Sequence, residues 1–148
     1  MSEEMLVGFM AVYLVLSLIS MGVGIIFYIA RWKMFVKAGE AGWKAIIPLY
    51  GEYITFKICW EGKFFWIVFG LMFLYAVLLG IGVASFSTIA IIGAIIALIA
   101  AIVIIIMMLN RLSRVFGMGV GFTVGLVLLY NFFIMILGFG SAEYKRNE

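Results

Sequence analysis

Residues 64–109 read FFWIVFGLMFLYAVLLGIGVASFSTIAIIGAIIALIAAIVIIIMML, which is 46 residues without a charged side chain. One straight helix of that length would be about 69 Å long, more than twice the roughly 30 Å of a hydrocarbon core. The stretch must therefore fold back on itself. Its turn-forming residues gather between Gly80 and Thr88, so the sequence predicts two membrane-spanning helices over residues 64–83 and 88–109.

Two further apolar runs flank this hairpin. Residues 5–30 contain no charge and suffice for about 39 Å of helix, and residues 119–139 form another uncharged run. The chain is 68% hydrophobic and 11% charged, whereas a soluble domain is roughly half apolar and about a quarter charged. The sequence therefore predicts an all-α membrane protein in which residues 1–148 form a single domain. Its four transmembrane helices are expected over about 5–30, 64–83, 88–109 and 119–139.

The distribution of Lys and Arg predicts the orientation of these spans. Six of the ten lie in the linker 31–63, two in the loop 110–118 and two in the tail 141–148. With four spans the linker and the loop share one side, which then carries eight cations against two. Because cytoplasmic loops are enriched in Lys and Arg, the linker and the loop are expected in the cytoplasm and both termini outside.

The linker 31–63 is too apolar to be disordered and has helical spacing. Pro48 has no backbone N–H and should divide it into two short pieces. Tryptophan occurs only in this region, between Trp32 and Trp66, which is typical of the headgroup layer. We expect an amphipathic helical segment on the cytoplasmic interface, with the cations facing anionic lipid headgroups. It is not expected to be a fifth span, because each buried charge would cost about 2.5–3.5 kcal/mol.

Three motifs resemble a family of small bacterial four-helix membrane proteins of unknown function. They are KAGEAGWKAIIPLY at residues 37–50, FGMGVGF at 116–122 and ILGFGSAEY at 136–144. The chain departs from the family pattern at Gly51, where an Asn usually follows the Tyr, and at Tyr130-Asn131-Phe132, where a Pro is common. The resemblance implies a multi-pass protein of the bacterial inner (plasma) membrane.

Members of that family are often labelled signal peptidase I automatically, but the residues of this chain do not support that chemistry. It resembles a Ser nucleophile with a Lys base beside a sizeable β-rich domain. No Ser-x-Met-x-Pro stretch is present, and Ser17 and Ser20 lie inside a span. The chain has no His or Asp and a single Cys, Cys59. We therefore expect no enzyme activity, no metal, no cofactor and no nucleic-acid partner.

Polar residues of the linker are the candidates for ligand or partner binding. Glu52 lies between two tyrosines and near Lys57, where it could bind a cationic or hydroxylated group; the alternative is a solvated interfacial face. In the last span, Asn131 with Thr123 either forms a structural hydrogen bond or lines a path. The candidates are Trp43, Lys44, Pro48, Tyr50, Glu52, Tyr53, Lys57 and Asn131.

Small residues at a spacing of four predict close helix packing. Gly117, Gly121 and Gly125 form one such stripe, and Gly93, Ala97 and Ala101 form a matching one on the third helix. These stripes predict either packing of the third helix against the fourth or homo-oligomerisation. Ser20 and Gly24 make a shorter pair on the first helix.

These observations favour a non-enzymatic accessory or scaffold subunit, which contacts lipid and partner helices. Its partners would be a second copy or another membrane protein. The alternative is a small oligomeric channel or permease for a small solute, and a third hypothesis is a membrane enzyme using Glu52, Tyr50 and Lys57.

Overall fold

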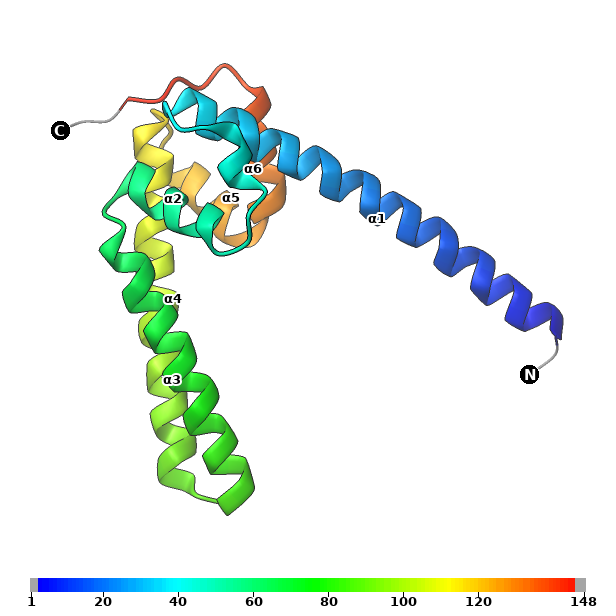
Figure 1. Cartoon of the computed structure of the whole chain (residues 1–148), viewed down its shortest axis with the longest axis vertical. Helices are drawn as coiled ribbons and strands as arrows, with labels where there is room; N and C mark the ends of the chain where they lie inside the picture. Colours follow the sequence, from blue (N-terminus) through cyan, green and yellow to red (C-terminus); the bar gives the residue numbers. More distant parts are fainter. Residues whose placement is uncertain (1–2, 146–148) are drawn as a thin grey trace.

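The structure, a computed structural model, describes residues 3–145, and every regular element among them is helical (Figure 1). In chain order the helices are α1 Glu3–Lys37, the short 3₁₀ helix η1 Gly42–Ala45, α2 Tyr50–Cys59, α3 Lys63–Ser85, α4 Thr88–Val115, α5 Val120–Leu128 and α6 Tyr130–Phe139.

The uncharged stretch 64–109 folds back on itself as predicted. Helices α3 and α4 pack side by side as a long hairpin (Figure 1). Phe86 takes the left-handed conformation at the turn, with a φ of 52°, and the Ser87 side chain accepts a hydrogen bond from the backbone N–H of Ala90. This N-cap satisfies one of the donors that a helix start leaves unpaired.

Three helices in residues 3–145 are long and apolar enough to cross a membrane: α1, α3 and α4. Helix α1 extends seven residues beyond the predicted end at Ala30, to Lys37. Most of it stands apart from the rest of the chain, and its first buried residue is Ala30 (Figure 1).

The predicted fourth span, one helix over residues 119–139, is not formed. The chain breaks at Leu129, where φ is −133° and ψ is 55°, and the two halves α5 and α6 fold against each other. At 1.5 Å per residue, their nine and ten residues make about 14 and 15 Å of helix, half of a hydrocarbon core. Ring contact between Phe122 and Phe133, with centroids 4.8 Å apart, holds the two short helices together.

The C-terminal segment lies beside the linker rather than across the molecule from it. The Tyr144 hydroxyl donates to the backbone carbonyl of Ile58 at 2.6 Å, and the Lys145 backbone N–H donates to the carbonyl of Val115 at 2.6 Å. The Lys37 ammonium donates to the carbonyl of Gly140 at 2.7 Å. This arrangement does not fit the predicted C-terminus on the opposite side of a membrane from the linker.

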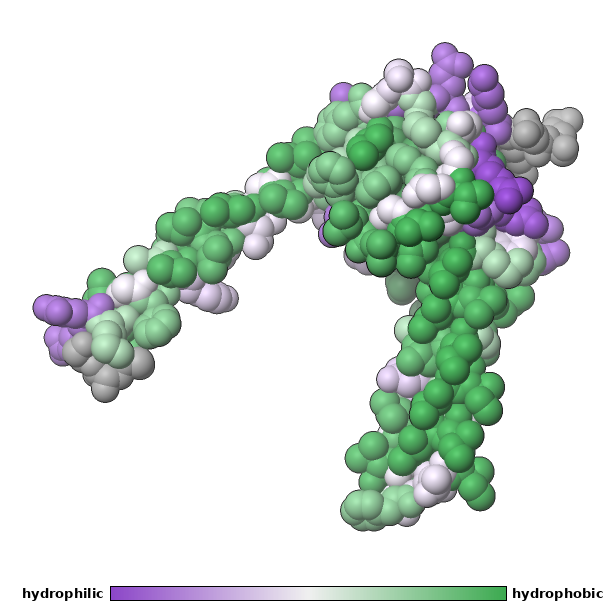
Figure 2. All heavy atoms as spheres, turned by 180° about the vertical axis from the view of Figure 1, so that it is seen from behind, coloured by the Kyte–Doolittle hydropathy of each residue, from purple (hydrophilic) through white to green (hydrophobic). Residues whose placement is uncertain are grey.

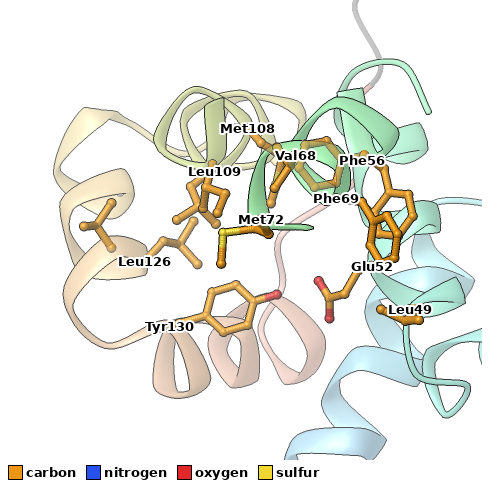
Figure 3. A pocket seen from close by; sticks show the side chains of 13 residues that line it. Leu49, Glu52, Phe56, Val68, Phe69, Met72, Met108, Leu109, Leu126 and Tyr130 are labelled. Atoms are coloured by element: carbon orange, nitrogen blue, oxygen red, sulfur yellow. The ribbon is translucent and has the colours of Figure 1, made fainter. Parts of the chain in front are cut away.

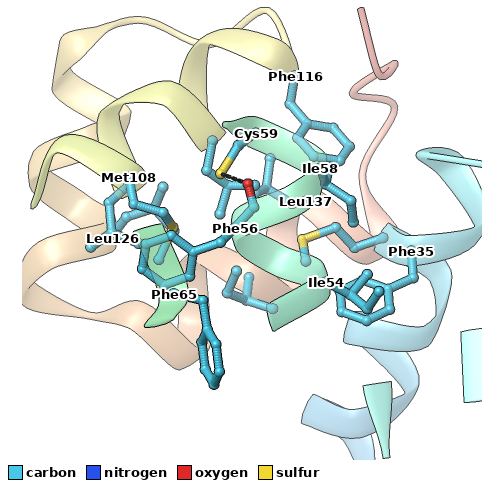
Figure 4. Packing of buried hydrophobic residues seen from close by; sticks show 14 of the residues in the cluster. Phe35, Ile54, Phe56, Ile58, Cys59, Phe65, Met108, Phe116, Leu126 and Leu137 are labelled. Atoms are coloured by element: carbon cyan, nitrogen blue, oxygen red, sulfur yellow. Dashed lines mark hydrogen bonds between the residues drawn. The ribbon is translucent and has the colours of Figure 1, made fainter. Parts of the chain in front are cut away.

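A single hydrophobic core joins all of the helices at one end of the molecule. We call this end the head and define it as residues 30–68 and 101–145. Its fully buried side chains come from α1, α2, α4, α5 and α6 (Figure 4): Met34, Phe35, Ile54, Leu112, Leu126, Ile134 and Leu137. Hydrophilic residues gather on the head and at the far tip of α1, while the α3–α4 hairpin is almost entirely apolar (Figure 2).

Candidate functional site

The linker forms two short helices in the head that meet at Pro48. The Gly51 N–H still donates to the Ile47 carbonyl across this junction, at 2.9 Å, while Leu49 takes a φ of 62°. Ile47, Tyr50, Ile54 and Ile58 recur at helical spacing in the linker, and of these only Ile54 and Ile58 are buried. Gly51 and Thr55 are buried beside them, so the buried face of α2 is turned toward Gly51 and Thr55 relative to its apolar spacing.

Arg31 explains that difference. It lies on the inner side of α1 with only 6% of its surface exposed. One guanidinium nitrogen donates to a Glu52 carboxylate oxygen at 2.7 Å, and the other donates to the Thr55 hydroxyl at 3.2 Å. The Thr55 hydroxyl in turn donates to the Gly51 carbonyl at 2.9 Å. A polar network thus draws the Gly51–Thr55 side of α2 onto α1.

Two phenylalanines of α1 flank the Arg31 guanidinium. Phe27 and Phe35 lie one helical turn before and after it, with ring centroids 5.8 and 5.7 Å from its central carbon. Cation–π attraction grows when the cation is removed from water, so the two rings stabilise this buried charge. The i−4 and i+4 aromatic spacing around a lone Arg was visible in the sequence, yet Arg31 was predicted only to face lipid headgroups.

A second ionic cluster ties the two pieces of the linker together. The Glu40 carboxylate accepts hydrogen bonds from Lys44 at 2.6 Å and from Lys57 at 2.9 Å. The bonds from Lys44 and Lys57 lower the pKa of Glu40, and the bond to Glu40 raises the pKa of Lys57. Glu40 thus pairs with Lys44 four residues later, whereas Glu61 pairs with Lys63. The candidate residues Lys44 and Lys57 thus serve in ion pairs within the head.

A cavity of about 540 Å³ opens between α2, the α3–α4 hairpin and the α5–α6 pair (Figure 3). Glu52 and Tyr130 provide the polar groups at one end, and Figure 3 shows their oxygen atoms directed toward each other. The remaining lining is apolar and consists of Leu49, Phe56, Phe65, Val68, Phe69, Met72, Ile105, Met108, Leu109, Leu126 and Val127.

Two buried polar atoms of residues in the vicinity of Glu52 have no hydrogen-bond partner within residues 3–145. They are the Tyr130 hydroxyl oxygen and the Nε of Arg31. Buried polar groups are nearly always paired in proteins, because an unpaired one loses its water without compensation. Tyr130 was not among the residues predicted from the sequence, where it reads as one more aromatic side chain of an apolar helix.

The remaining linker candidates lie at the outer surface of the head. Trp43 is 51% exposed. Tyr50 and Tyr53 stack at a centroid distance of 6.1 Å, and together with Pro48 they line a shallow groove of about 400 Å³ beside Trp66. These aromatic side chains therefore form part of the outer surface of the head.

Asn131 and Thr123 are not brought together. Asn131 is exposed in the first turn of α6, whereas Thr123 is buried and its hydroxyl accepts from the Asn110 side chain at 3.4 Å. The first N–H groups of a helix have no intrahelical partner, which favours a polar side chain such as Asn131 at that place. The path expected from this pair is therefore absent from a single copy of the described chain.

The glycine stripe of residues 117–125 does not pack as a unit. Gly117 lies in the turn before α5 with a φ of 71°, and Gly121 faces open space. Gly125 instead makes room for the Phe133 ring of α6. On the matching stripe, Ala97 and Ala101 are buried, and Gly93 lies against Leu78 of α3.

Cys59 is buried and donates its thiol to the Thr55 carbonyl at 3.0 Å. Burial raises the pKa of this thiol to about 12, so a reactive thiolate is not formed near neutral pH. Residues 3–145 contain no cluster of three or more metal-ligating side chains.

The fold and site define an all-helical protein with three helices suited to crossing a membrane and an ion-paired head beside an open apolar cavity. Residues 43–147 match the Family of unknown function (DUF5684), and the chain belongs to this family. No match was found among curated proteins or among solved structures. Helix α1 precedes the matched residues, although it supplies Arg31 and Phe35 to the head.

Proposed function

We propose that this protein is a non-enzymatic accessory or scaffold subunit of the bacterial inner membrane, which binds a partner helix through α1. The observation that carries the proposal is that most of α1 makes no contact with the other described helices. Its apolar side chains from Met5 to Ile29 are largely exposed, and α1 contacts the other elements through its C-terminal part in the head. The three linker carboxylates Glu40, Glu52 and Glu61 are engaged in ion pairs, which supports a structural role for them.

The orientation that the fold supports has three spans, with the linker and the C-terminus in the cytoplasm. Residues 141–145 adjoin the linker, so Lys145 of the tail joins the eight cations of the linker and the loop 110–118. All nine Lys and Arg of residues 3–145 then lie on one side, a stronger positive-inside signal than eight against two. The pair α5–α6 enters and leaves the membrane from the cytoplasmic side as a re-entrant hairpin. The exposed cations Lys33, Arg111, Arg114 and Lys145 would contact anionic headgroups.

A small-residue pair on α1 indicates where a partner helix would approach. Ser20 and Gly24 share one face of the helix, and no atom lies within 4 Å of a Cβ placed on Gly24. Without a hydrophobic driving force in lipid, helices associate where small residues let their backbones come close. Within residues 3–145 no other helix packs against this pair. It is therefore accessible to a helix of another chain or of a second copy.

Cross-linking in intact membranes tests this proposal. A photoreactive residue in place of Met21 should capture one discrete protein or a second copy, and Gly24→Leu should reduce that product severalfold by blocking close approach. Gly22→Leu is the matched control, since Gly22 lies on another face of α1 and also has open space around it. Capture of lipid alone, or equal effects of the two substitutions, would contradict the proposed role of α1.

A small oligomeric channel or permease is the second candidate, favoured by one observation. The Asn131 side chain is exposed on an otherwise apolar helix and makes no hydrogen bond within residues 3–145. In an oligomer it could line a path between copies. Solute flux in proteoliposomes that Asn131→Leu abolishes would support this candidate, and flux that the substitution leaves unchanged would exclude that role.

A further inference from the structure

We infer that the cavity between α2, α3, α4 and the α5–α6 pair binds a neutral long-chain lipid that ends in a hydroxyl group. The lipid chain would lie along the α3–α4 hairpin, and its hydroxyl would lie between Tyr130 and Glu52. This site is separate from the α1 surface and does not depend on the accessory role proposed above.

The apolar part of the cavity fits a hydrocarbon chain. It lies alongside α3 and α4 and is lined there by Val68, Met72 and Ile105. Its volume of about 540 Å³ falls within the roughly 300–1,000 Å³ of small-molecule sites. The rim side chains Phe69 and Met72 are 43% and 41% exposed, so the cavity is open along the hairpin, where lipid surrounds the protein.

The polar end lacks one hydrogen-bonding group. The Tyr130 hydroxyl is buried without a partner, and only one of the two Glu52 carboxylate oxygens is bonded to Arg31. Figure 3 shows the hydroxyl and the carboxylate facing each other across the end of the cavity. A ligand hydroxyl can accept from the Tyr130 O–H and donate to the second Glu52 oxygen, because it is both donor and acceptor. One alcohol would satisfy both groups.

The charges at this end favour a neutral ligand. The Arg31 cation and the Glu52 anion are 2.7 Å apart and cancel each other. Both terminal nitrogens of Arg31 already donate to protein groups, Glu52 and Thr55. A phosphate or carboxylate would place a second anion beside Glu52, and an ammonium group would meet the Arg31 cation. Neither ion finds an uncompensated opposite charge there.

Photolabelling of the full-length protein in phosphatidylcholine nanodiscs tests the inference. The probes are hexadecanol with a diazirine in its chain, its methyl ether and the corresponding carboxylic acid. We expect the alcohol to label the peptides that contain Met108 and Leu126 about fivefold to tenfold more than the ether or the acid, since one hydrogen bond distinguishes the ligands.

Tyr130→Phe should reduce alcohol labelling severalfold, because the ligand hydroxyl loses the donor from which it accepts. This variant is expected to fold, because the hydroxyl it removes makes no hydrogen bond within the described chain. Tyr13→Phe is the matched control, since Tyr13 is 76% exposed on α1, and it should change nothing. Met72→Trp, which fills the cavity, should suppress labelling by all three probes.

Two outcomes would overturn the inference. Equal labelling by the alcohol, the ether and the acid would show that the cavity holds hydrocarbon chains without selecting a headgroup. Alcohol labelling that Tyr130→Phe leaves unchanged, or labelling that survives Met72→Trp, would place the bound alcohol elsewhere.

Discussion

At the scale of single residues, Arg31 decides how the head is assembled. It is a charged residue near the end of a long apolar helix, yet it is buried and joins α1 to α2 through Glu52 and Thr55. The two partners of the ion pair are unequally buried, because the side chain of Arg31 is 7% exposed and that of Glu52 is 43% exposed. Their removal should therefore have unequal effects.

We predict that Glu52→Leu destabilises the head more than Arg31→Leu does. The first substitution leaves a buried guanidinium without its anion and should cost about 3 kcal/mol, whereas the second leaves a carboxylate that water can reach and should cost about 1 kcal/mol. Thermal unfolding of both variants in detergent measures the difference. The double variant should recover part of the loss from Glu52→Leu, and strictly additive losses would argue against coupling between the two residues.

The Glu40 cluster should make stability depend on pH. Hydrogen bonds from Lys44 and Lys57 hold the pKa of Glu40 below its usual value of 4.5. A lowered pKa stabilises the fold above the value of the unfolded chain, and this contribution is lost as the pH falls through the folded value. Glu40→Gln should therefore lower the Tm at neutral pH, and the difference from the wild type should shrink toward zero below pH 4.5.

The matched control for this pH series is Glu61→Gln. Glu61 pairs with Lys63 on the surface, and both side chains are more than half exposed, so its loss should matter little at any pH. A Tm difference for Glu40→Gln that stays constant from neutral to acidic pH would contradict the assigned role of its carboxylate.

At the scale of elements, the α5–α6 pair is the main departure from the sequence prediction. In a straight helix over residues 119–139, Gly121 and Gly125 would share one face. In the hairpin, only Gly125 faces a neighbour, the Phe133 ring. The junction at Leu129 contains neither Gly nor Pro, so the break arises from packing of the two halves and not from a local signal.

The two glycines therefore distinguish the hairpin from a straight helix. Gly125→Leu should destabilise the protein by about 1–3 kcal/mol, because the added side chain has to displace the Phe133 ring. Gly121→Leu, with nothing within 4 Å, should be neutral or slightly stabilising, since Leu favours helix more than Gly does. Unfolding in detergent checks both variants, and equal effects would favour one continuous helix.

At the scale of the whole molecule, the position of the C-terminal segment supports the proposed three-span orientation. Its hydrogen bonds to Ile58 and Val115 place it beside the linker and the end of α4. The turn at Phe86 lies at the far end of the hairpin and is 92% exposed (Figure 1). The N-terminal acidic residues Glu3 and Glu4 begin α1 at the end remote from the head.

We predict that Ser141 and Trp43 lie on the same side of the membrane, and Phe86 on the other. Single cysteines at these three positions, in a Cys59→Ala background, can be labelled with an impermeant maleimide from one side of oriented vesicles. Ser141→Cys should react together with Trp43→Cys and not with Phe86→Cys. Reaction of Ser141→Cys together with Phe86→Cys would instead require a fourth complete span.

Much of the candidate site could not be predicted from the sequence. The sequence pointed to Glu52, Lys44 and Lys57, because these polar residues stand out within one short and mostly apolar segment. Arg31 and Tyr130 were missed because their significance depends on distant residues. Arg31 bonds to Glu52 across 21 positions in the chain, and the isolation of the Tyr130 hydroxyl is apparent only once its surroundings are known.

The sequence by itself determined the long apolar helix α1 and the hairpin of residues 64–109, whose helices are long and apolar enough to cross a membrane. Hydrophobic length and the absence of charge are local properties, and lipid imposes them on each segment separately. Only the tertiary structure decided that the last apolar run folds into α5 and α6, that the tail returns to the linker, and that a cavity with an unpaired hydroxyl remains. These features depend on which side chains meet across the fold, because an apolar run of that length is equally compatible with a span or with two short packed helices.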